Sequence, residues 1–370
     1  MSANTIIAQA YLRHAIDLEK FKAAERNKAL KLLKTLEQDL VVDLVRADVT
    51  AANRTRLTAL LQQVRATIQS SYTDFRTDFE SDLMQLAQLE GEFAAKAMNT
   101  GIGAQIFTVE WSAKTLKAIV GDAHIQGGPL REWWDRQAAL AQQRVMDTIR
   151  LGVLRGDDTG TITSTLRTEL FQGTLRRNTE ALVRTSVASI SNDARLQLFD
   201  ENSDVVQFVQ QHSTLDARTT PICMAYSGKL WKLPNYEPVG HDLPFNNGVP
   251  RHWGCRSTIV PSFPAFGVLA GGKSKQAEAD KMFRSRLRDM DVPEPQIAAQ
   301  IRNAQASMDG VVPESWDYEE WLSNQSKARQ LDILGPGKYK LWQAGKLKLT
   351  DLVDQSGDPL TLEELKQNVA

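Results

Sequence analysis

The chain has 370 residues, of which 42% are hydrophobic and 24% are charged, and its formal net charge is -1 at pH 7. This composition is typical of a globular protein with two or three domains and excludes a chain that is disordered throughout. The near-zero net charge excludes a global electrostatic field that would attract nucleic acid or an anionic membrane. Any such binding must come from local patches.

No secretion signal or membrane span is expected. Residues Met1 to Leu12 lack a basic region followed by an apolar core. The longest charge-free apolar stretch, Ile259 to Gly272, contains prolines and glycines and is shorter than the roughly 20 residues that a span needs. Two cysteines in so long a chain do not make a disulfide scaffold, so the expected compartment is a cytosol.

Apolar residues recur at helical spacing over the first hundred residues. One stripe runs from Ile7 to Leu44 and a second runs from Leu57 to Phe93. Their steps average close to 3.6 residues, which favours straight helices over a long supercoil. We therefore predict an antiparallel helical hairpin over residues 1–100, either as core helices of a bundle or as an exposed hairpin that meets a partner.

A helical connecting region is expected over residues 101–160. Helices are predicted around Ser112–Val120 and over Leu130–Leu154. The second of these contains the adjacent Trp133 and Trp134, which cannot share one helix face. At least one of the two rings is therefore expected at an edge or a contact surface.

Strand-like sequence occurs only in a central domain expected over residues 161–266. A helix over Asn178–Phe199 comes first, and strands are then predicted at Val205–Val209, Lys229–Leu233 and Arg256–Val260. The central domain should therefore be a small, loop-rich α+β module.

The remainder of the chain is expected to be helical. Residues 267–312 should form a linker and a charged helix, and residues 313–370 a set of short helices. The run Leu334–Gly337 predicts a helix stop, and Thr361 with Glu364 fits a capping box. The predicted fold is thus mainly α, with an N-terminal helical hairpin or bundle, a central β-containing domain and a helical C-terminal region.

The stretch from Asp216 to Arg256 is the most informative part of the chain, because it contains both cysteines. Its candidate structural residues are Asp216, Arg218, Thr219, Cys223, His252, Cys255 and Arg256. Helix or sheet periodicity alone cannot hold such a loop-rich segment together. Specific side-chain contacts, or a metal, must fix it.

Three explanations of this motif remain open. Cys223, His252 and Cys255 could bind a structural Zn²⁺, with Asp216, His212 or His241 as the fourth ligand. Alternatively, the motif is a hydrogen-bonded knot, in which the aspartate pairs with Arg218 or Arg256 and the thiols are small buried groups. The third explanation is a disulfide between the two cysteines, formed under oxidising conditions.

Catalytic interpretations are not favoured. His241, Asn246 or Asn247, and His252 superficially match an HNH nuclease, but they lie within a dozen residues, too close for a strand–loop–helix metal finger. Cys255 with His252 could serve a cysteine protease, yet no signature surrounds a nucleophile. We therefore predict no catalytic residue and no enzymatic activity.

A series of short motifs follows one another through the second two thirds of the chain. They are Arg184-Thr185, Asn192-x-Ala194-Arg195, Asp216-x-Arg218-Thr219, Cys223, Gly228 to Trp231, His252-x-x-Cys255-Arg256, Pro261, Tyr318-x-x-Trp321-Leu322, Leu334-Gly335 and Gly345-Lys346. In this order they resemble the phage Mu F-like head morphogenesis (minor head, or minor capsid) protein family, from about Pro129 to the C-terminus. Members often carry further cysteines where this chain has Thr219, Thr220 and Ser257, so the resemblance carries over no four-cysteine metal site.

This resemblance implies a structural minor head protein of a tailed double-stranded DNA phage or prophage. Such a protein would associate with the portal protein in the capsid interior, with the major capsid or a scaffold protein as a further candidate partner. It would act in head morphogenesis and in genome packaging or ejection. It would be found in the virion, inside the head near the portal, and in the host cytoplasm during assembly. Trp133, Trp134 and Trp231 are the candidate partner-binding anchors, since buried aromatic residues dominate interface energies.

Two alternative functions remain. An ejected effector or toxin-type enzyme would show host-side activity that depends on Cys255 or His252. A DNA-binding head protein would use two basic clusters, one of arginines from Arg150 to Arg195 and one at Lys273–Arg288, for non-specific contact with packaged DNA. Acidic neighbours dilute both clusters, so solvated helix faces are the simpler interpretation. No membrane partner is expected, and no cofactor other than the structural zinc considered above.

Overall fold

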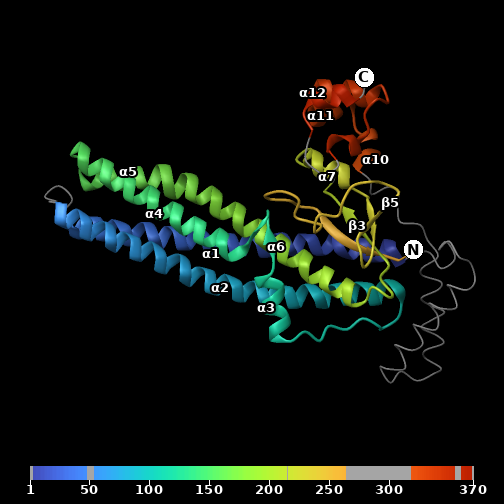
Figure 1. The fold of residues 1–370 in the computed structure, drawn as a ribbon, viewed down its shortest axis with the longest axis horizontal. Coiled ribbons are helices and arrows are strands. Elements are labelled where there is room, and N and C mark those ends of the chain that lie inside the picture. Colours follow the sequence, from blue (N-terminus) through green and yellow to red (C-terminus); the bar gives the residue numbers. More distant parts are fainter. Residues whose placement is uncertain (1–2, 48–53, 215, 264–317, 355–359, 369–370) are drawn as a thin grey trace, which may run out of the picture. The chain divides into compact units, whose positions relative to one another are not determined.

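The computed structural model describes residues 3–47, 54–214, 216–263, 318–354 and 360–368 (Figure 1). The linker and charged helix predicted at 267–312, with the basic cluster Lys273–Arg288, lie outside the described residues. Within the described ranges, no helix combines the length and the apolar character that crossing a membrane requires.

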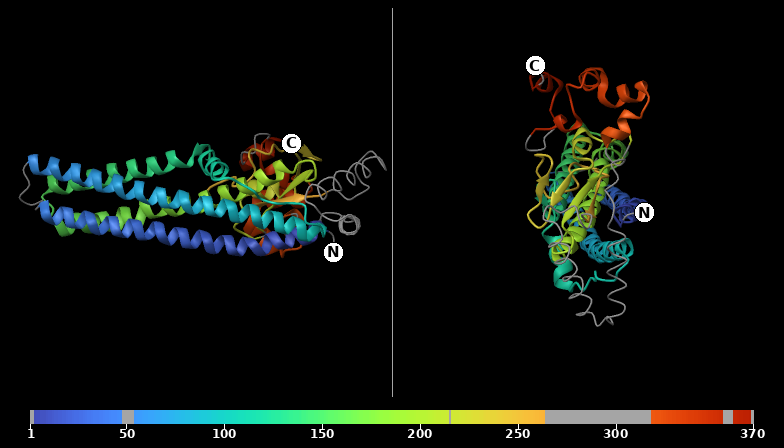
Figure 2. Two further views of the ribbon diagram at one scale, coloured as in Figure 1. Left: turned by 90° about the horizontal axis from the view of Figure 1, so that it is seen from below. Right: turned by 90° about the vertical axis from the view of Figure 1, so that its right-hand side faces the viewer.

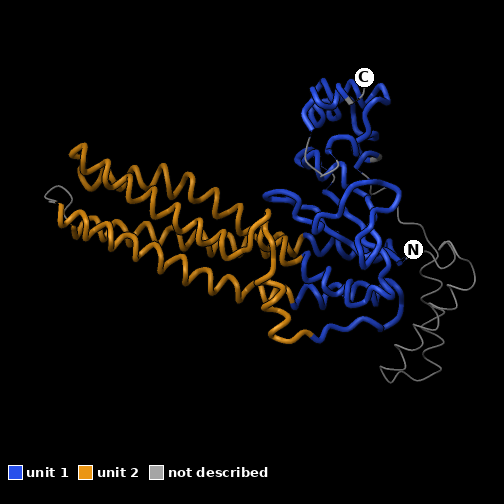
Figure 3. Tube along the Cα trace, viewed as in Figure 1, with its two compact units in different colours: residues 1–15, 88–110, 192–370 blue, residues 16–87, 111–191 orange. Residues whose placement is uncertain are grey.

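The chain divides into two compact units, each assembled from separate stretches of sequence (Figure 3). Unit 1 comprises residues 1–15, 88–110 and 192–370, and unit 2 comprises residues 16–87 and 111–191. Three long helices contribute residues to both units: α1 (Ala3–Ala47), α2 (Arg54–Ile102) and α6 (Leu175–Glu201). The division of the chain into five consecutive domains remains a prediction.

Unit 2 is a helical bundle in which parts of α1, α2 and α6 lie beside α4 (Leu130–Arg155) (Figure 2). The Lys28 ammonium of α1 lies 2.8 Å from the Asp82 carboxylate of α2. Further along, the Thr67 hydroxyl of α2 donates to the Asp43 carboxylate of α1 at 3.3 Å. Residue numbers therefore rise along one helix as they fall along the other, which confirms the predicted antiparallel hairpin.

Helix α4 matches its predicted range to within one residue. It follows Pro129, whose extended backbone sets the start, and it ends at Gly156, which adopts φ 77°. Such a left-handed residue commonly ends a helix and is most often glycine. Most of the buried side chains of α4 recur every three or four residues, at Leu130, Trp134, Ala138, Ala141, Val145 and Ile149, and Met146 extends the stripe by one position. This apolar stripe holds α4 in the bundle.

The smaller elements of unit 2 connect the long helices. They are α3 (Ala113–Gly121), the paired short strands β1 (His124–Ile125) and β2 (Gly128–Pro129), α5 (Thr159–Thr165) and a π-helical segment (Leu166–Thr174). The Ser112 hydroxyl accepts from the Thr115 backbone N–H at 3.1 Å and so caps α3 at the position where the predicted helix starts.

Unit 1 contains an antiparallel sheet in the order β5-β4-β3-β6. Its strands are β3 (Phe208–His212), β4 (Leu230–Lys232), β5 (Glu237–Val239) and β6 (Thr258–Ser262), and the short helix α7 (Pro221–Tyr226) lies between β3 and β4 in the chain. The strand predicted at Val205–Val209 is wrong by three residues, because Val205 and Val206 are buried in the turn after α6. These two valines are apolar because their side chains are buried, and they do not belong to a strand.

The C-terminal helices of unit 1 are α10 (Tyr318–Ser323), α11 (Lys327–Gln343) and α12 (Leu362–Asn368), with a 3₁₀ turn at Leu349–Leu352. They surround a core of Met224, Tyr318, Leu322, Leu334, Leu347, Leu349, Leu352 and Leu365. The predicted stop appears as a break at Gly335 (φ 71°, ψ 159°), after which helical structure resumes. The capping box is confirmed, since Thr361 and Glu364 exchange hydrogen bonds of 2.8 and 3.3 Å. The fold is therefore mainly α with a small α+β module, as predicted.

Candidate functional site

Asp216 and Arg256 form the charged part of the central motif. Asp216 lies between β3 and α7, and Arg256 lies just before β6. The two guanidinium nitrogens Nη1 and Nη2 of Arg256 each lie 2.7 Å from one oxygen of the Asp216 carboxylate. These hydrogen bonds from Arg256 hold the pKa of Asp216 well below its ordinary value. A bidentate pair of this kind fixes the loop before α7 to the approach of β6.

The rest of the Asp216 turn is also fixed by hydrogen bonds. The backbone N–H of Arg218 donates to the Asp216 carboxylate at 2.9 Å, whereas the Arg218 guanidinium is largely exposed. The Thr219 hydroxyl donates to the carbonyl oxygen of Thr214. The Tyr318 hydroxyl donates to the Asp216 carbonyl oxygen at 2.8 Å and so connects α10 to this turn. The aspartate thus organises a turn through both its side chain and its backbone.

The two cysteines and His252 converge beside this turn. Cys223 lies in α7, after Pro221 at the first turn, while His252 and Cys255 belong to a turn closed by the Cys255 N–H to His252 carbonyl bond of 3.1 Å. The two Sγ atoms are 3.6 Å apart, and His252 Nε2 lies 3.3 Å from Cys223 Sγ. All three of these atoms lie within 4.8 Å of one another. Both cysteines are buried free thiols.

The close approach of the two thiols shifts their pKa values in opposite directions. The hydrogen bond from Cys223 holds the pKa of Cys255 below its ordinary value, against the effect of burial. The same bond, together with burial, raises the pKa of Cys223. The hydrogen bond to Cys255 raises the pKa of His252.

None of the three predicted fourth ligands joins this cluster. The Asp216 carboxylate is bound to Arg256. His212 is buried, its Nε2 lies 2.9 Å from the Gln210 side-chain oxygen, and burial lowers its pKa to about 4. The ring nitrogens of His241 face backbone groups at 2.9 and 3.1 Å. Among the described residues, the cluster that could hold a metal ion consists of Cys223, His252 and Cys255.

Residues 143–260, from within α4 to within β6, match the family described as Phage Mu protein F like protein. This segment, 118 of the 370 residues, is thus similar to the Mu F-like family, and the rest of the chain lies outside the match. Over these residues, the match confirms the resemblance that the sequence motifs showed. Neither the curated proteins nor the solved structures compared with the chain gave a match.

Two of the three tryptophans expected as partner anchors are core residues. Trp134 is 1% exposed, and Trp231 is fully buried, with its indole N–H donating to the Leu243 carbonyl oxygen at 2.9 Å. Trp133 is partly buried, and its indole N–H donates to the Ile125 carbonyl oxygen at 2.6 Å. The expectation for Trp134 and Trp231 is corrected, because a partner cannot reach either ring in this fold.

A buried ion pair connects the Mu F-like motif at Arg195 to α2. The Nη2 atom of the Arg195 guanidinium lies 2.5 Å from the Oε2 atom of the Glu90 carboxylate. The Arg195 side chain is 5% exposed and the Glu90 side chain is 1% exposed. His14 Nε2 lies 2.8 Å from the second oxygen of Glu90. Arg195 also donates to the Thr258 hydroxyl of β6 at 2.7 Å. This single arginine therefore connects α1, α2, α6 and the sheet within unit 1.

Sequence reasoning did not find Arg251, which lies at the centre of the Mu F-like module. Its guanidinium carbon is 3.4 Å from the centre of the Tyr226 ring. Its Nε donates to the Gln211 side-chain oxygen at 2.6 Å, and its Nη1 donates to the Phe245 carbonyl oxygen at 3.1 Å. Burial lowers the pKa of Arg251 to about 10. Nothing in the local pattern distinguishes this arginine from exposed ones.

Proposed function

We propose that this protein is a minor head protein of a tailed double-stranded DNA phage or prophage that associates with the portal inside the capsid. In this role it acts structurally, in head assembly and in genome packaging or ejection, and it passes through the host cytoplasm during assembly. The observation that carries the proposal is the Mu F-like match over residues 143–260. A structural role is supported by the central motif, whose charged groups pair with one another.

The arginine cluster from Arg150 to Arg195 gives little support to a DNA-binding role. Acidic partners within ion-pair distance are Asp147 for Arg150, Glu37 for Arg167, Glu180 for Arg176, Glu19 for Arg184 and Glu90 for Arg195. Such pairs cancel much of the local positive charge. The arginines therefore favour contacts between helices over a continuous basic surface for DNA.

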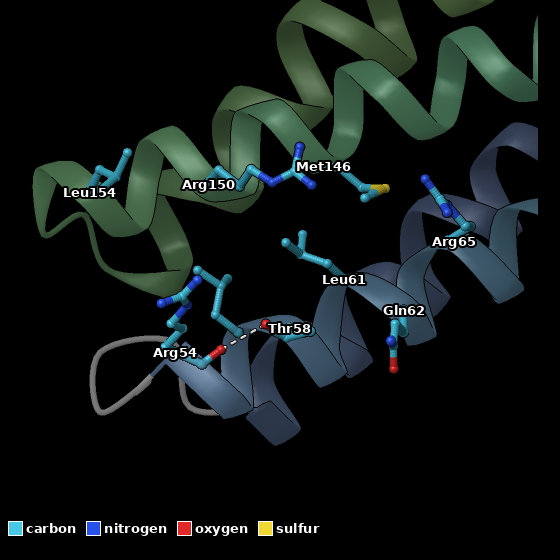
Figure 4. Close-up of a pocket in the computed structure, with 9 residues that line it drawn as sticks. Arg54, Thr58, Leu61, Gln62, Arg65, Met146, Arg150 and Leu154 are labelled. Carbon is cyan, nitrogen blue, oxygen red and sulfur yellow. Dashed lines mark hydrogen bonds between the residues drawn. The ribbon is translucent and has the colours of Figure 1, made fainter.

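A groove in unit 2 is suited to docking a partner (Figure 4). It lies between the first turns of α2 and the last turns of α4 and has a volume of about 450 Å³. Its lining residues are Arg54, Leu57, Thr58, Leu61, Gln62, Arg65, Met146, Arg150 and Leu154. Leu154 is 81% exposed. The groove thus combines an apolar floor with arginines, and no acidic residue is found among the described residues that line it.

This chemistry fits an acidic amphipathic helix of the portal. The apolar face of such a helix would cover Leu61, Met146 and Leu154, and its carboxylates would meet Arg54 and Arg65. Arg150 already lies 3.0 Å from Asp147 and contributes less net charge. Opposite charges across the rim would speed association and fix the orientation of the helix.

Binding of the purified full chain to purified portal tests the proposal. Leu154→Asn and Arg65→Glu should each weaken binding about 5- to 30-fold, the effect of losing one interface contact of roughly 1–2 kcal/mol. The matched controls are Ile16→Asn and Lys20→Glu, which alter an exposed apolar residue and an exposed cation of the same unit outside the groove. These controls should bind like the unaltered chain.

The two parts of the proposal fail separately. If the unaltered chain does not bind portal at micromolar concentration, the portal-associated role is wrong. If the chain binds but the groove variants match their controls, the role stands and the groove is not the docking surface.

A further inference from the structure

Cys223, His252 and Cys255 are spaced like three corners of a tetrahedral zinc site. With Zn–S bonds of about 2.3 Å and a Zn–N bond of about 2.0 Å, a tetrahedron separates two sulfurs by about 3.8 Å and a sulfur from a nitrogen by about 3.5 Å. The distances here are 3.6 Å between the sulfurs and 3.3 Å from Cys223 Sγ to His252 Nε2. Small movements of these side chains would therefore suffice to bind a metal ion.

The imidazole of His252 is oriented as a ligand. Its Nδ1 lies 3.0 Å from the carbonyl oxygen of Trp253. A carbonyl oxygen only accepts hydrogen bonds, so Nδ1 carries the proton in the neutral ring. The lone pair of Nε2 then points toward Cys223. Histidine ligands of metals commonly donate their other N–H to a backbone carbonyl in this way.

A small cavity adjoins two of the three ligands. Its volume is about 30 Å³, and its lining includes Cys223, His252 and Thr220. The Thr220 hydroxyl oxygen is buried and has no well-aligned hydrogen-bond partner in the part of the chain that the structure describes, although it lies close enough to the Cys223 thiol to oppose the rise in the pKa of that thiol. A cavity of this size and polarity can hold one water molecule, and the Thr220 hydroxyl can bond to that water.

We propose that Cys223, His252 and Cys255 bind one Zn²⁺ ion and that a water molecule in the adjoining cavity is the fourth ligand. Two thiolates and an imidazole are donors that zinc prefers over the oxygen ligands suited to Mg²⁺ or Ca²⁺. On binding, both thiols release their protons to solvent and no atom changes oxidation state. The ion would fix α7 to the turn before β6, and this role does not depend on portal docking.

Metal binding by the reduced full-length chain tests the proposal. Titration with Co²⁺ should give one equivalent per chain, with thiolate-to-cobalt charge-transfer absorption and the intense visible bands of tetrahedral cobalt. Equimolar Zn²⁺ should then remove these bands. The unaltered chain alone supplies this readout, so it does not depend on any variant folding.

Two substitutions and two controls locate the site. Cys223→Ser and His252→Gln should lower the Zn²⁺ affinity at least tenfold, whereas His241→Gln and His212→Gln should retain one equivalent per chain. Circular dichroism of each variant separates loss of a ligand from loss of fold. A variant that is unfolded is set aside, and the cobalt spectrum of the unaltered chain then decides.

Several results would overturn the proposal. They are a reduced chain that takes up neither ion at micromolar concentration, an octahedral cobalt spectrum without thiolate charge transfer, and full zinc content in Cys223→Ser. Loss of zinc from His241→Gln or His212→Gln would overturn the assignment of water as the fourth ligand.

Discussion

Replacing Arg195 with methionine is expected to destabilise the protein strongly at neutral pH. The substitution leaves the Glu90 carboxylate, 1% exposed, with the His14 ring as its remaining side-chain contact among the described residues. Removing one partner of a buried ion pair typically costs about 3–5 kcal/mol, because the remaining charge is buried without compensation. The free energy of unfolding should fall by about that amount.

The pH dependence distinguishes the two ways of breaking this pair. Burial disfavours the charged form of Glu90, but the charge of Arg195 and the hydrogen bond from His14 together lower its pKa below the ordinary value. Without Arg195, burial should raise the pKa of the carboxyl group above its unfolded value. The loss in Arg195→Met should therefore shrink as the pH falls and the carboxyl group takes up a proton in the folded state. Between neutral pH and about 4.5, the ordinary pKa of a glutamate, Glu90→Gln should show no such relief, because arginine does not lose its proton.

Urea denaturation followed by circular dichroism measures these effects. The double variant Glu90→Gln/Arg195→Met should lose at least about 2 kcal/mol less than the sum of the single variants, since contacting residues couple. Lys20→Met breaks an exposed pair with Asp17 and should cost at most about 1 kcal/mol. Additive single effects, or a loss below about 1 kcal/mol in Arg195→Met, would refute the reasoning.

Three further predictions concern stability. Gly152→Ala should cost about 1–3 kcal/mol of stability in thermal melts, because the new Cβ would lie 2.8 Å from the Cδ1 atom of Ile162 in α5. Its control, Gly121→Ala, places a Cβ with no atom within 4 Å and should leave the stability nearly unchanged. Burial lowers the pKa of His212 from 6.5 to about 4, so as the pH falls the unfolded chain takes up a proton on this residue before the folded chain does. Up to about 3 kcal/mol of stability should therefore be lost between pH 6.5 and pH 4. Urea titrations at several pH values should show a smaller loss of stability for His212→Gln over this range. Asp216→Asn should lower the free energy of unfolding in urea by about 1–2 kcal/mol, a modest loss because the Asp216–Arg256 pair is partly exposed to solvent. Arg218→Gln should change it by less than about 0.5 kcal/mol, because this side chain is largely exposed. Equal losses in the two variants would contradict the bidentate pair.

The sequence predicted the long helices well, because helical spacing of apolar residues is a strong signal over many turns. The ranges of α1, α2 and α4 follow directly from it. The strands were harder to predict, because they are short and because apolar residues also occur in buried turns. The strand β5, with three exposed residues, carries no apolar signal at all. The glycine at 173 inside the π-helical segment likewise left no recognisable pattern.

The candidate site was predicted in part. The sequence left Arg218 and Arg256 as alternative partners of Asp216, and the structure gives the bidentate pair to Arg256. The two thiols lie close together and are buried. The orientations of Asp216, His212 and His241 away from the thiols could not be predicted, because they depend on partners that the sequence does not reveal. The Glu90 contact did leave a signal: this residue falls on the buried face of α2, four positions after Leu86. An acidic residue on an apolar stripe indicates a buried partner.

The ties between distant segments of unit 1 have a consequence for how genes of this kind can be exchanged. The Asn4 side chain makes hydrogen bonds of 2.8 and 2.9 Å to the backbone of Phe263, and Glu90 neutralises Arg195. A hybrid gene that took residues 143–260 from another parent would keep Glu90 but replace Arg195 and its surroundings. Hybrids should therefore be viable when the first hundred residues and the central segment come from the same parent. The part of the gene that has to be exchanged intact is then the one that encodes unit 1, and not residues 143–260 alone.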